Sequence, residues 1–287
     1  MSKTDQTETV SNRHFQYDFY RRLVRTIDRD FEFRTLASYP SCRSVDRPVA
    51  FMRHDVDVCI DEAVEMARIE HDLGIQSTYM ILPSTPLYDV DEKRDRIDEI
   101  RSLGHEIGLH CAVEFQADPA IRDGRTDGGP TDGDLIDGNL HDRGLTDGGL
   151  TEDERDQIRI ERERLESVLD EPIRSISYHQ PIERVLYGPS HVEGMVNAYS
   201  EELMSTYISD SGGRWREGSP IGSVQRAIGS DSIQVLTHPV WWADGPRSPF
   251  ERFFRVADRL DVIDERVRAE LVSIFPPYGM RIASGRT

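Results

Sequence analysis

Five apolar segments of this 287-residue sequence end in aspartate or histidine, and helix-like segments separate them. The segments are "VAFM" before Asp55 and Asp57, "GHEIGLH" ending at His110, "SISYH" ending at His179, "MSTYIS" before Asp210, and "IQVLTH" ending at His238. Strands that alternate with helices predict a parallel sheet with right-handed crossovers. A parallel barrel delivers the C-terminal ends of its strands to one face, so we expect these side chains to meet there.

The boundaries of several elements carry their own signals. Apolar positions in 60–73, closed by Gly74, predict an amphipathic helix. "STYMIL" predicts a further strand, and the charged stretch 91–103 predicts a helix. Thr151 with Glu154 forms a capping box that predicts a helix start, and a second box with a first-turn proline begins at Ser248.

The composition narrows the class of protein. The net charge is −18, and lysine occurs only at Lys3 and Lys93, a balance typical of halophilic proteins that stay hydrated at high salt. Such a charge disfavours a nucleic-acid partner. No stretch of the sequence approaches 18 consecutive apolar residues, so we expect no membrane span. Residues 1–14 are polar, which predicts a disordered tail without a secretory signal. Three cysteines without framework spacing favour a reducing, cytoplasmic location.

One segment has a different character. Residues 126–150 repeat a five-residue unit rich in aspartate and glycine, with one leucine in most units. A lone leucine per unit cannot build a core, so we expect a flexible acidic insertion at about 118–150. Weak calcium binding is an alternative, although the spacing differs from the known nine-residue calcium repeat.

The motifs "FMRHDVD", "GHEIGLH", "SYHQP", "ISDSGGRW" and "VLTHPVWW" follow one another in this order. Together they resemble the five motifs of the polysaccharide deacetylase superfamily, which is also known as the NodB-homology family or carbohydrate esterase family 4. The resemblance covers about 47–245, interrupted by the repeat. It implies a distorted (β/α)7-type barrel, here a single domain over 15–287, and metal-dependent removal of an N-acetyl or similar acyl group from a sugar.

In this resemblance, Asp55 corresponds to the general base and Asp57 to a metal ligand. Alternation along an extended segment points both carboxylates to one side and turns Val56 toward the packing side. His54 faces the opposite way, so we expect a structural role for it. A carboxylate beside a divalent metal can take the proton of an attacking water.

Two motifs depart from the family pattern. Its second motif supplies two histidine ligands, and here His110 is followed four residues later by Glu114. Its third motif carries an arginine that pairs with the base, and here that position holds His179. Glu114 and His179 are therefore competing third ligands, and the sequence favours neither. His105 lies at the strand's start and is expected to be remote. The expected metal is zinc, with cobalt or nickel as alternatives.

The later motifs supply the remaining implied roles. His238 would protonate the leaving amine, Asp210 would hold its other ring nitrogen, and Leu236 would line the acyl-methyl pocket. Trp215 and Trp242 are suited either to stacking on a sugar ring or to ordinary packing.

Three functions fit these observations. The first is a deacetylase acting on a glycan precursor for surface polysaccharide or glycoconjugate biosynthesis. The second is a catalytically silent carbohydrate-binding protein on the same barrel. The third is a hydrolase of a small non-sugar amide. The sequence leaves the sugar, the acyl group and the oligomeric state open.

Overall fold

The structure, a computed structural model, describes residues 14–39, 41, 47–113, 149–260 and 263–283. The predicted N-terminal tail and acidic insertion fall outside these ranges, apart from His14, Gly149 and Leu150. Within the described part of the chain, no helix is both long enough and apolar enough to cross a membrane.

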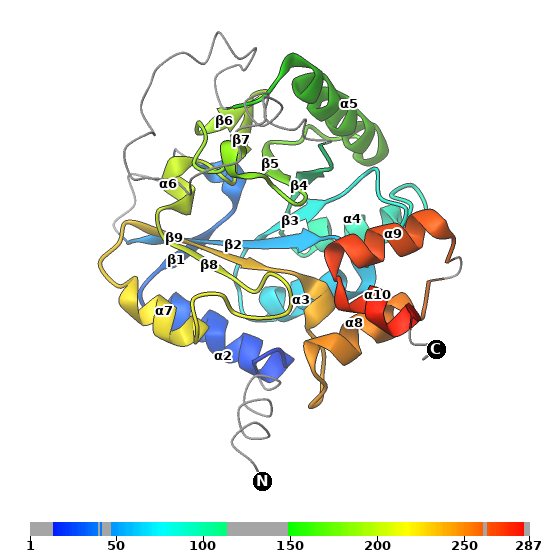
Figure 1. Cartoon of the computed structure of the whole chain (residues 1–287). Helices are drawn as coiled ribbons and strands as arrows, with labels where there is room; N and C mark the ends of the chain where they lie inside the picture. The colour runs from blue at the N-terminus through cyan, green and yellow to red at the C-terminus, as the bar shows by residue number, and fades with distance from the viewer. Residues whose placement is uncertain (1–13, 40, 42–46, 114–148, 261–262, 284–287) are drawn as a thin grey trace, which may run out of the picture.

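A single curled sheet organises the molecule (Figure 1). Its strands run in the order β6-β7-β5-β4-β3-β2-β9-β8. Strand β1 pairs with the first half of β2, and β3 pairs with the second half along the same edge. All pairs are parallel except β6 with β7. The strands are β1 (Glu32–Arg34), β2 (Val49–Val56), β3 (Thr78–Ile81), β4 (Glu106–Cys111), β5 (Ser175–Tyr178), β6 (His191–Val192), β7 (Met195–Asn197), β8 (Tyr207–Ser209) and β9 (Ser232–Thr237).

Helices cover the outside of the sheet, with α2, α3, α7 and α8 along one side and α5 on the other (Figure 1). The helices are α2 (Tyr17–Asp28), α3 (Ile60–Asp72), α4 (Arg94–Ser102), α5 (Glu152–Leu169), α6 (Glu201–Met204), α7 (Pro220–Arg226), α8 (Pro249–Ala257), α9 (Glu265–Ile274) and α10 (Pro277–Ala283), with short 3₁₀ turns η1 (Leu36–Ser38), η5 (Glu183–Val185) and η6 (Pro239–Trp241). The fold is a single α/β domain on a curled half-barrel sheet, which is the distorted-barrel architecture predicted from the sequence.

The helix-start signals are confirmed. Thr151 accepts from the backbone N–H of Glu154 while the Glu154 carboxylate accepts from Thr151, and Ser248 with Glu251 repeats this arrangement at α8. Each box satisfies N–H groups that the first turn of a helix leaves without partners. Gly74 follows α3 with φ of 74°, in the left-handed region that favours glycine.

Two boundaries differ from the sequence prediction. The expected strand 204–209 starts late, because Ser200 caps a short helix and Met204 is its last residue. The acidic insertion also ends earlier than 150. Leu150 is fully buried in the core between sheet and helices, and a Cβ at Gly149 would collide with the backbone oxygen of Arg184. The last leucine of the repeat therefore belongs to the folded domain.

The inner face of the sheet changes character along the strands. Toward the N-terminal ends it combines a small apolar cluster, which contains Phe51 and Met80, with the Glu106 carboxylate, which accepts from Thr78 and Ser175. Gly108 lies beside Met80, and a side chain there would collide with Met80 and with Ser175. Toward the C-terminal ends, the same face carries aspartate and histidine, so the fold delivers the predicted polar residues to one end of the barrel.

Candidate functional site

A cavity of about 510 Å³ lies at the C-terminal ends of the strands, where the sequence predicts the site. Its lining includes most of the predicted site residues: Asp55, Asp57, His110, His179, Leu236 and His238. The structure thus brings together side chains from β2, β4 and β9 and from the residue that follows β5. A cavity of this size lies within the usual range for small-molecule sites.

Three of these residues form a candidate metal centre. The ligand atoms of Asp57, His110 and His179 all lie within 4.8 Å of one another. Asp57 Oδ1 is 3.0 Å from His110 Nε2 and 3.3 Å from His179 Nδ1. Asp57 Oδ1 is buried, and among the described residues no donor makes a well-aligned hydrogen bond to it. An unsatisfied buried oxygen that faces two ring nitrogens fits a divalent cation, and a carboxylate with two imidazoles is a donor set that zinc accepts.

Both histidines are held through their other ring nitrogen. His110 Nδ1 lies 2.7 Å from Ser177 Oγ, its neighbour across β4 and β5. His179 Nε2 lies 3.0 Å from Glu270 Oε1 on α9. A proton on each of these held nitrogens makes the opposite nitrogen, which faces Asp57, the one available to a metal. This second set of contacts is typical of metal-ligating histidines.

The charges around the three residues favour a cation. Burial opposes a charge on His179, but the carboxylates of Asp57 and Glu270, which face its two ring nitrogens, outweigh it and raise the pKa of His179 to about 10. Burial also opposes ionisation of Asp57, yet its contacts with His110 and His179 hold the pKa of this carboxyl well below its ordinary value. Without a metal, a protonated His179 therefore balances the buried Asp57 carboxylate, and a divalent metal would take over this role as the proton leaves.

Asp55 is held as an anion by Arg53. The guanidinium donates from Nε and Nη2 to the two oxygens of Asp55, at 2.8 and 2.6 Å, and also donates to Tyr199 Oη at 2.8 Å. Burial alone would raise the pKa of Asp55, but the charge and hydrogen bonds of Arg53 lower it on balance. The resemblance noted in the sequence implies such a pairing for an arginine of the third motif, and here Arg53 on β2 makes it instead.

His238 is fixed by Asp210. Asp210 Oδ1 lies 2.6 Å from His238 Nδ1, and Asp210 also accepts from the His238 backbone N–H and from the Trp242 indole N–H. His238 Nε2 is directed toward the metal centre, 3.9 Å from Asp57 Oδ2. Burial opposes the charged form, but the hydrogen bond and charge of Asp210 raise the pKa of His238 to about 9.

The two tryptophans do not take the expected position at the cavity. Trp242 is only 1% exposed, packs against Phe15 and Tyr20, and donates to Asp210, so it cannot stack on a sugar. Trp215 is half-buried against Phe15 and is absent from the cavity lining. Packing on the N-terminal segment explains both positions. Trp241 lines the cavity instead.

Other sequence expectations have mixed outcomes. Glu114 lies outside the described residues, so its competition with His179 is untested. His105 is bonded to Ser77 and to the Ala67 carbonyl, remote from the cavity as expected. Cys111 faces the outer core, opposite His110, as strand alternation requires.

His54 has the structural role predicted for it. It is fully buried, with Nδ1 2.6 Å from Thr237 Oγ1 and Nε2 2.9 Å from Glu70 Oε1. Glu70 also accepts from Ser77, Tyr20 and Tyr79, so one buried carboxylate joins α2, α3, β2 and β3. This network lies behind the strand that carries Asp55.

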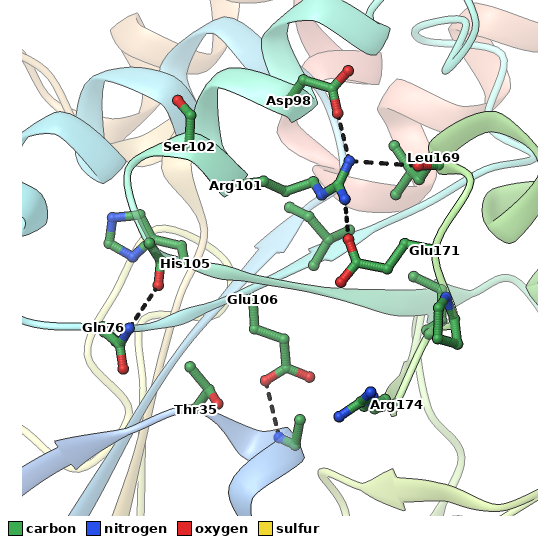
Figure 2. Close-up of a pocket in the computed structure, with 15 residues that line it drawn as sticks. Thr35, Gln76, Asp98, Arg101, Ser102, His105, Glu106, Leu169, Glu171 and Arg174 are labelled. Carbon is green, nitrogen blue, oxygen red and sulfur yellow. Dashed lines mark hydrogen bonds and ion pairs between the residues drawn. The ribbon is translucent and has the colours of Figure 1, made fainter.

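A second cavity, of about 650 Å³, lies at the opposite ends of β4 and β5 (Figure 2). Figure 2 shows Arg101 bonded to both Asp98 and Glu171, and Glu106 directed at a backbone N–H, that of Ala37. These groups satisfy one another, and the N-terminal face of a parallel barrel is ordinarily the stabilising face.

Sequence reasoning missed Arg53, Ser177 and Glu270. Arg53 was detectable, because it precedes Asp55 and Asp57 at the same two-residue spacing and so shares their face of β2. Ser177 precedes His179 in the same way. Glu270 has no local signal, because its contact with His179 spans 91 positions of the chain.

Comparisons with known proteins give limited similarity. No protein-family model matches the chain, and no curated protein matches it. Among solved structures, BA3943 from Bacillus anthracis, described as a CE4 family pseudoenzyme, matches with a TM-score of 0.40 and 14% identity, over 75% of this chain and 61% of that chain. A mutant of BA3943 described as having restored enzymatic activity matches with 0.40 and 15%, over 75% and 63%. This chain thus spans less than two thirds of those chains.

Proposed function

We propose that this protein is a metal-dependent deacetylase that removes an N-acetyl or similar acyl group from a sugar or glycan precursor, in surface polysaccharide or glycoconjugate biosynthesis. The observation that carries the proposal is the convergence of Asp57, His110 and His179 at a cavity that also contains Asp55 and His238. The order of the five sequence motifs, which resembles that of polysaccharide deacetylases, supports the same proposal.

Each residue has a chemical role in the proposal. Asp57, His110 and His179 hold the metal, for which zinc is the first candidate. When bound, a divalent metal supplies Lewis-acid chemistry, which polarises an acyl carbonyl and makes water acidic enough to attack it. Asp55, kept ionised by Arg53, takes the proton of the attacking water.

His238 is the proposed acid. Asp210 holds Nδ1, so Nε2 is the nitrogen that carries a proton toward the metal side of the cavity. A pKa of about 9 keeps His238 protonated at neutral pH, and it can donate to the leaving nitrogen. Leu236, in the layer below, provides an apolar contact for the acyl methyl group.

The cavity walls bear on the substrate class. Tyr207 lines the cavity and is half-buried, and it combines an aromatic surface with a hydroxyl group, which suits a sugar. Trp215 and Trp242 do not line the cavity, so they do not favour a sugar over a second candidate substrate class, the small non-sugar amides. The substrate panel therefore includes both classes.

The test is acyl release by the full chain. Parent protein with added zinc or cobalt is assayed for acetate against N-acetylated monosaccharides, nucleotide-linked sugars, chitooligosaccharides and small non-sugar amides. We expect release from at least one sugar substrate, and loss of release in Asp55→Asn and His238→Ala. Release only from the small amides would favour the second candidate. A metal-loaded parent that releases nothing would contradict a deacetylase and favour the silent binding protein.

A further inference from the structure

Helix α9 contacts the segment that carries the third metal-ligand candidate. Glu270 Oε1 lies 3.0 Å from His179 Nε2. One turn further along the same helix face, Ser273 Oγ accepts from Gln180 Nε2 at 2.9 Å and donates to Gln180 Oε1 at 3.0 Å. Two neighbouring residues after β5 are thus bonded to two residues of one helix. In Figure 1, α9 is the orange-red helix that comes just before α10 near the end of the chain.

The backbone at this point needs such support. His179 is tied to β4 through its N–H, which donates to the Cys111 carbonyl at 2.8 Å. Gln180, which follows, has a φ of 50°, in the left-handed region that costs a non-glycine residue about 1 kcal/mol or more. The side-chain bonds of Gln180 to Ser273 offset part of that cost and fix where the chain leaves β5.

The ring orientation of His179 depends on Glu270. An imidazole that leaves a strand end can rotate about its side-chain torsions and can carry its proton on either nitrogen. A carboxylate at Nε2 favours a proton there, which makes Nδ1, 3.3 Å from Asp57 Oδ1, the nitrogen available to a metal. The side chains of His179 and Glu270 are 11% and 24% exposed, so water competes only weakly for this bond.

We propose that Glu270 is a positioning residue for metal binding, and that α9 orients His179 as a ligand through Glu270 while Ser273 holds the adjacent backbone. The proposal rests on the proposed metal centre. Outer partners of ligating histidines ordinarily contribute about 10- to 100-fold to metal affinity. Glu270 itself is outside the group of converging ligand atoms, so it acts through His179 rather than as a ligand.

The test measures zinc affinity by competition with a chromogenic chelator, on the full chain without substrate. The variants are Glu270→Ala, Glu270→Gln, Ser273→Ala and Asp57→Ala. Glu265→Gln, an exposed glutamate in the first turn of the same helix, is the matched control. Thermal unfolding of each metal-free variant shows whether the fold is retained.

We expect Glu270→Ala to weaken zinc binding by about 10- to 100-fold at an unchanged metal-free melting temperature. Glu270→Gln should recover part of the affinity, because an amide oxygen still accepts from Nε2, and Ser273→Ala should lose less than Glu270→Ala. Glu265→Gln should match the parent. Parent affinity in Glu270→Ala, with binding abolished in Asp57→Ala, would overturn the positioning role and leave the metal centre intact. A parent that binds no zinc would overturn both proposals.

Discussion

Arg53 and Asp55 project from the same face of β2, two residues apart, and the guanidinium of one donates to both carboxylate oxygens of the other. Both side chains are buried, so each would be costly to ionise alone. Their pairing lets a strand end carry an anionic aspartate inside the barrel.

Replacing Arg53 tests this pairing. Arg53→Met should raise the pKa of Asp55, because burial would then act without the opposing guanidinium. The acidic limb of the pH–activity profile should move to higher pH by about 1–3 units. Arg34→Met, which removes a half-buried arginine paired with Glu32 on β1, is the control and should leave the limb in place. An acidic limb that does not respond to Arg53 would remove Asp55 from the role of base.

The alkaline limb should report His238. An acid catalyst is lost as the pH rises through its pKa, so activity should persist to about pH 9. Asp210→Asn removes the charge that stabilises the imidazolium and should move this limb to lower pH. Asp55→Asn and His238→Ala should each lose about 10²-fold or more of activity while zinc content is retained. A limb indifferent to both His238 and Asp210 would exclude His238 as the acid.

The parts of the site that sequence could predict are those encoded by local spacing. Asp55, Asp57, His110, Asp210 and His238 each follow or end an apolar run, and parallel topology alone is enough to bring them together. The competition between Glu114 and His179 is different, because it depends on where a loop and a helix lie. The place of His179 among the converging ligand atoms follows from the turn after β5 and from α9, and neither has a signal near the histidine.

Of the two roles that the sequence allows for the tryptophans, the structure shows packing. Trp242 lies in the motif "VLTHPVWW", four residues after His238, but η6 turns it toward Phe15 and Tyr20 and away from the cavity. Phe15, just before α2, and Tyr20 on α2 supply these contacts from more than 200 positions away, in a part of the chain for which the sequence predicts no element. Contacts between segments far apart in the chain leave no local sequence signal. The order of the elements was therefore predictable, whereas the partners of individual aromatic rings were not.

The buried network around Glu70 should make stability depend on pH. Burial opposes ionisation of Glu70, but His54, His105 and Ser77 outweigh it and lower the pKa of this carboxyl to about 2. A lowered folded-state pKa contributes stability above the unfolded value of 4.5 and loses it as the pH falls toward 2. The shift corresponds to about 3 kcal/mol of unfolding free energy. Denaturant unfolding at several pH values should show a flatter dependence in Glu70→Gln, and an unchanged one in the exposed control Glu163→Gln. Equal pH dependence in parent and Glu70→Gln would contradict the account.

The boundary of the acidic insertion can be tested with a matched pair of changes. Replacing 126–148 by a short Gly-Ser linker should leave unfolding free energy and zinc content unchanged, because the repeat has too little apolar surface to offset the entropy of ordering it. Leu150→Ala should cost about 2–5 kcal/mol, since Leu150 is fully buried. Loss of folded protein in the linker variant, or a neutral Leu150→Ala, would show that the boundary is misplaced.

The central claim is that Asp57, His110 and His179 form one metal site, and zinc stoichiometry of the purified full chain tests it most directly. The parent should bind one zinc per chain, and Asp57→Ala, His110→Ala and His179→Ala should each lose it, with Glu114→Ala retaining it. Metal-free melting temperatures close to that of the parent would show that the variants remain folded. A parent without zinc, or a His179→Ala variant that keeps zinc while Glu114→Ala loses it, would contradict the assignment of the third ligand and the account built on it.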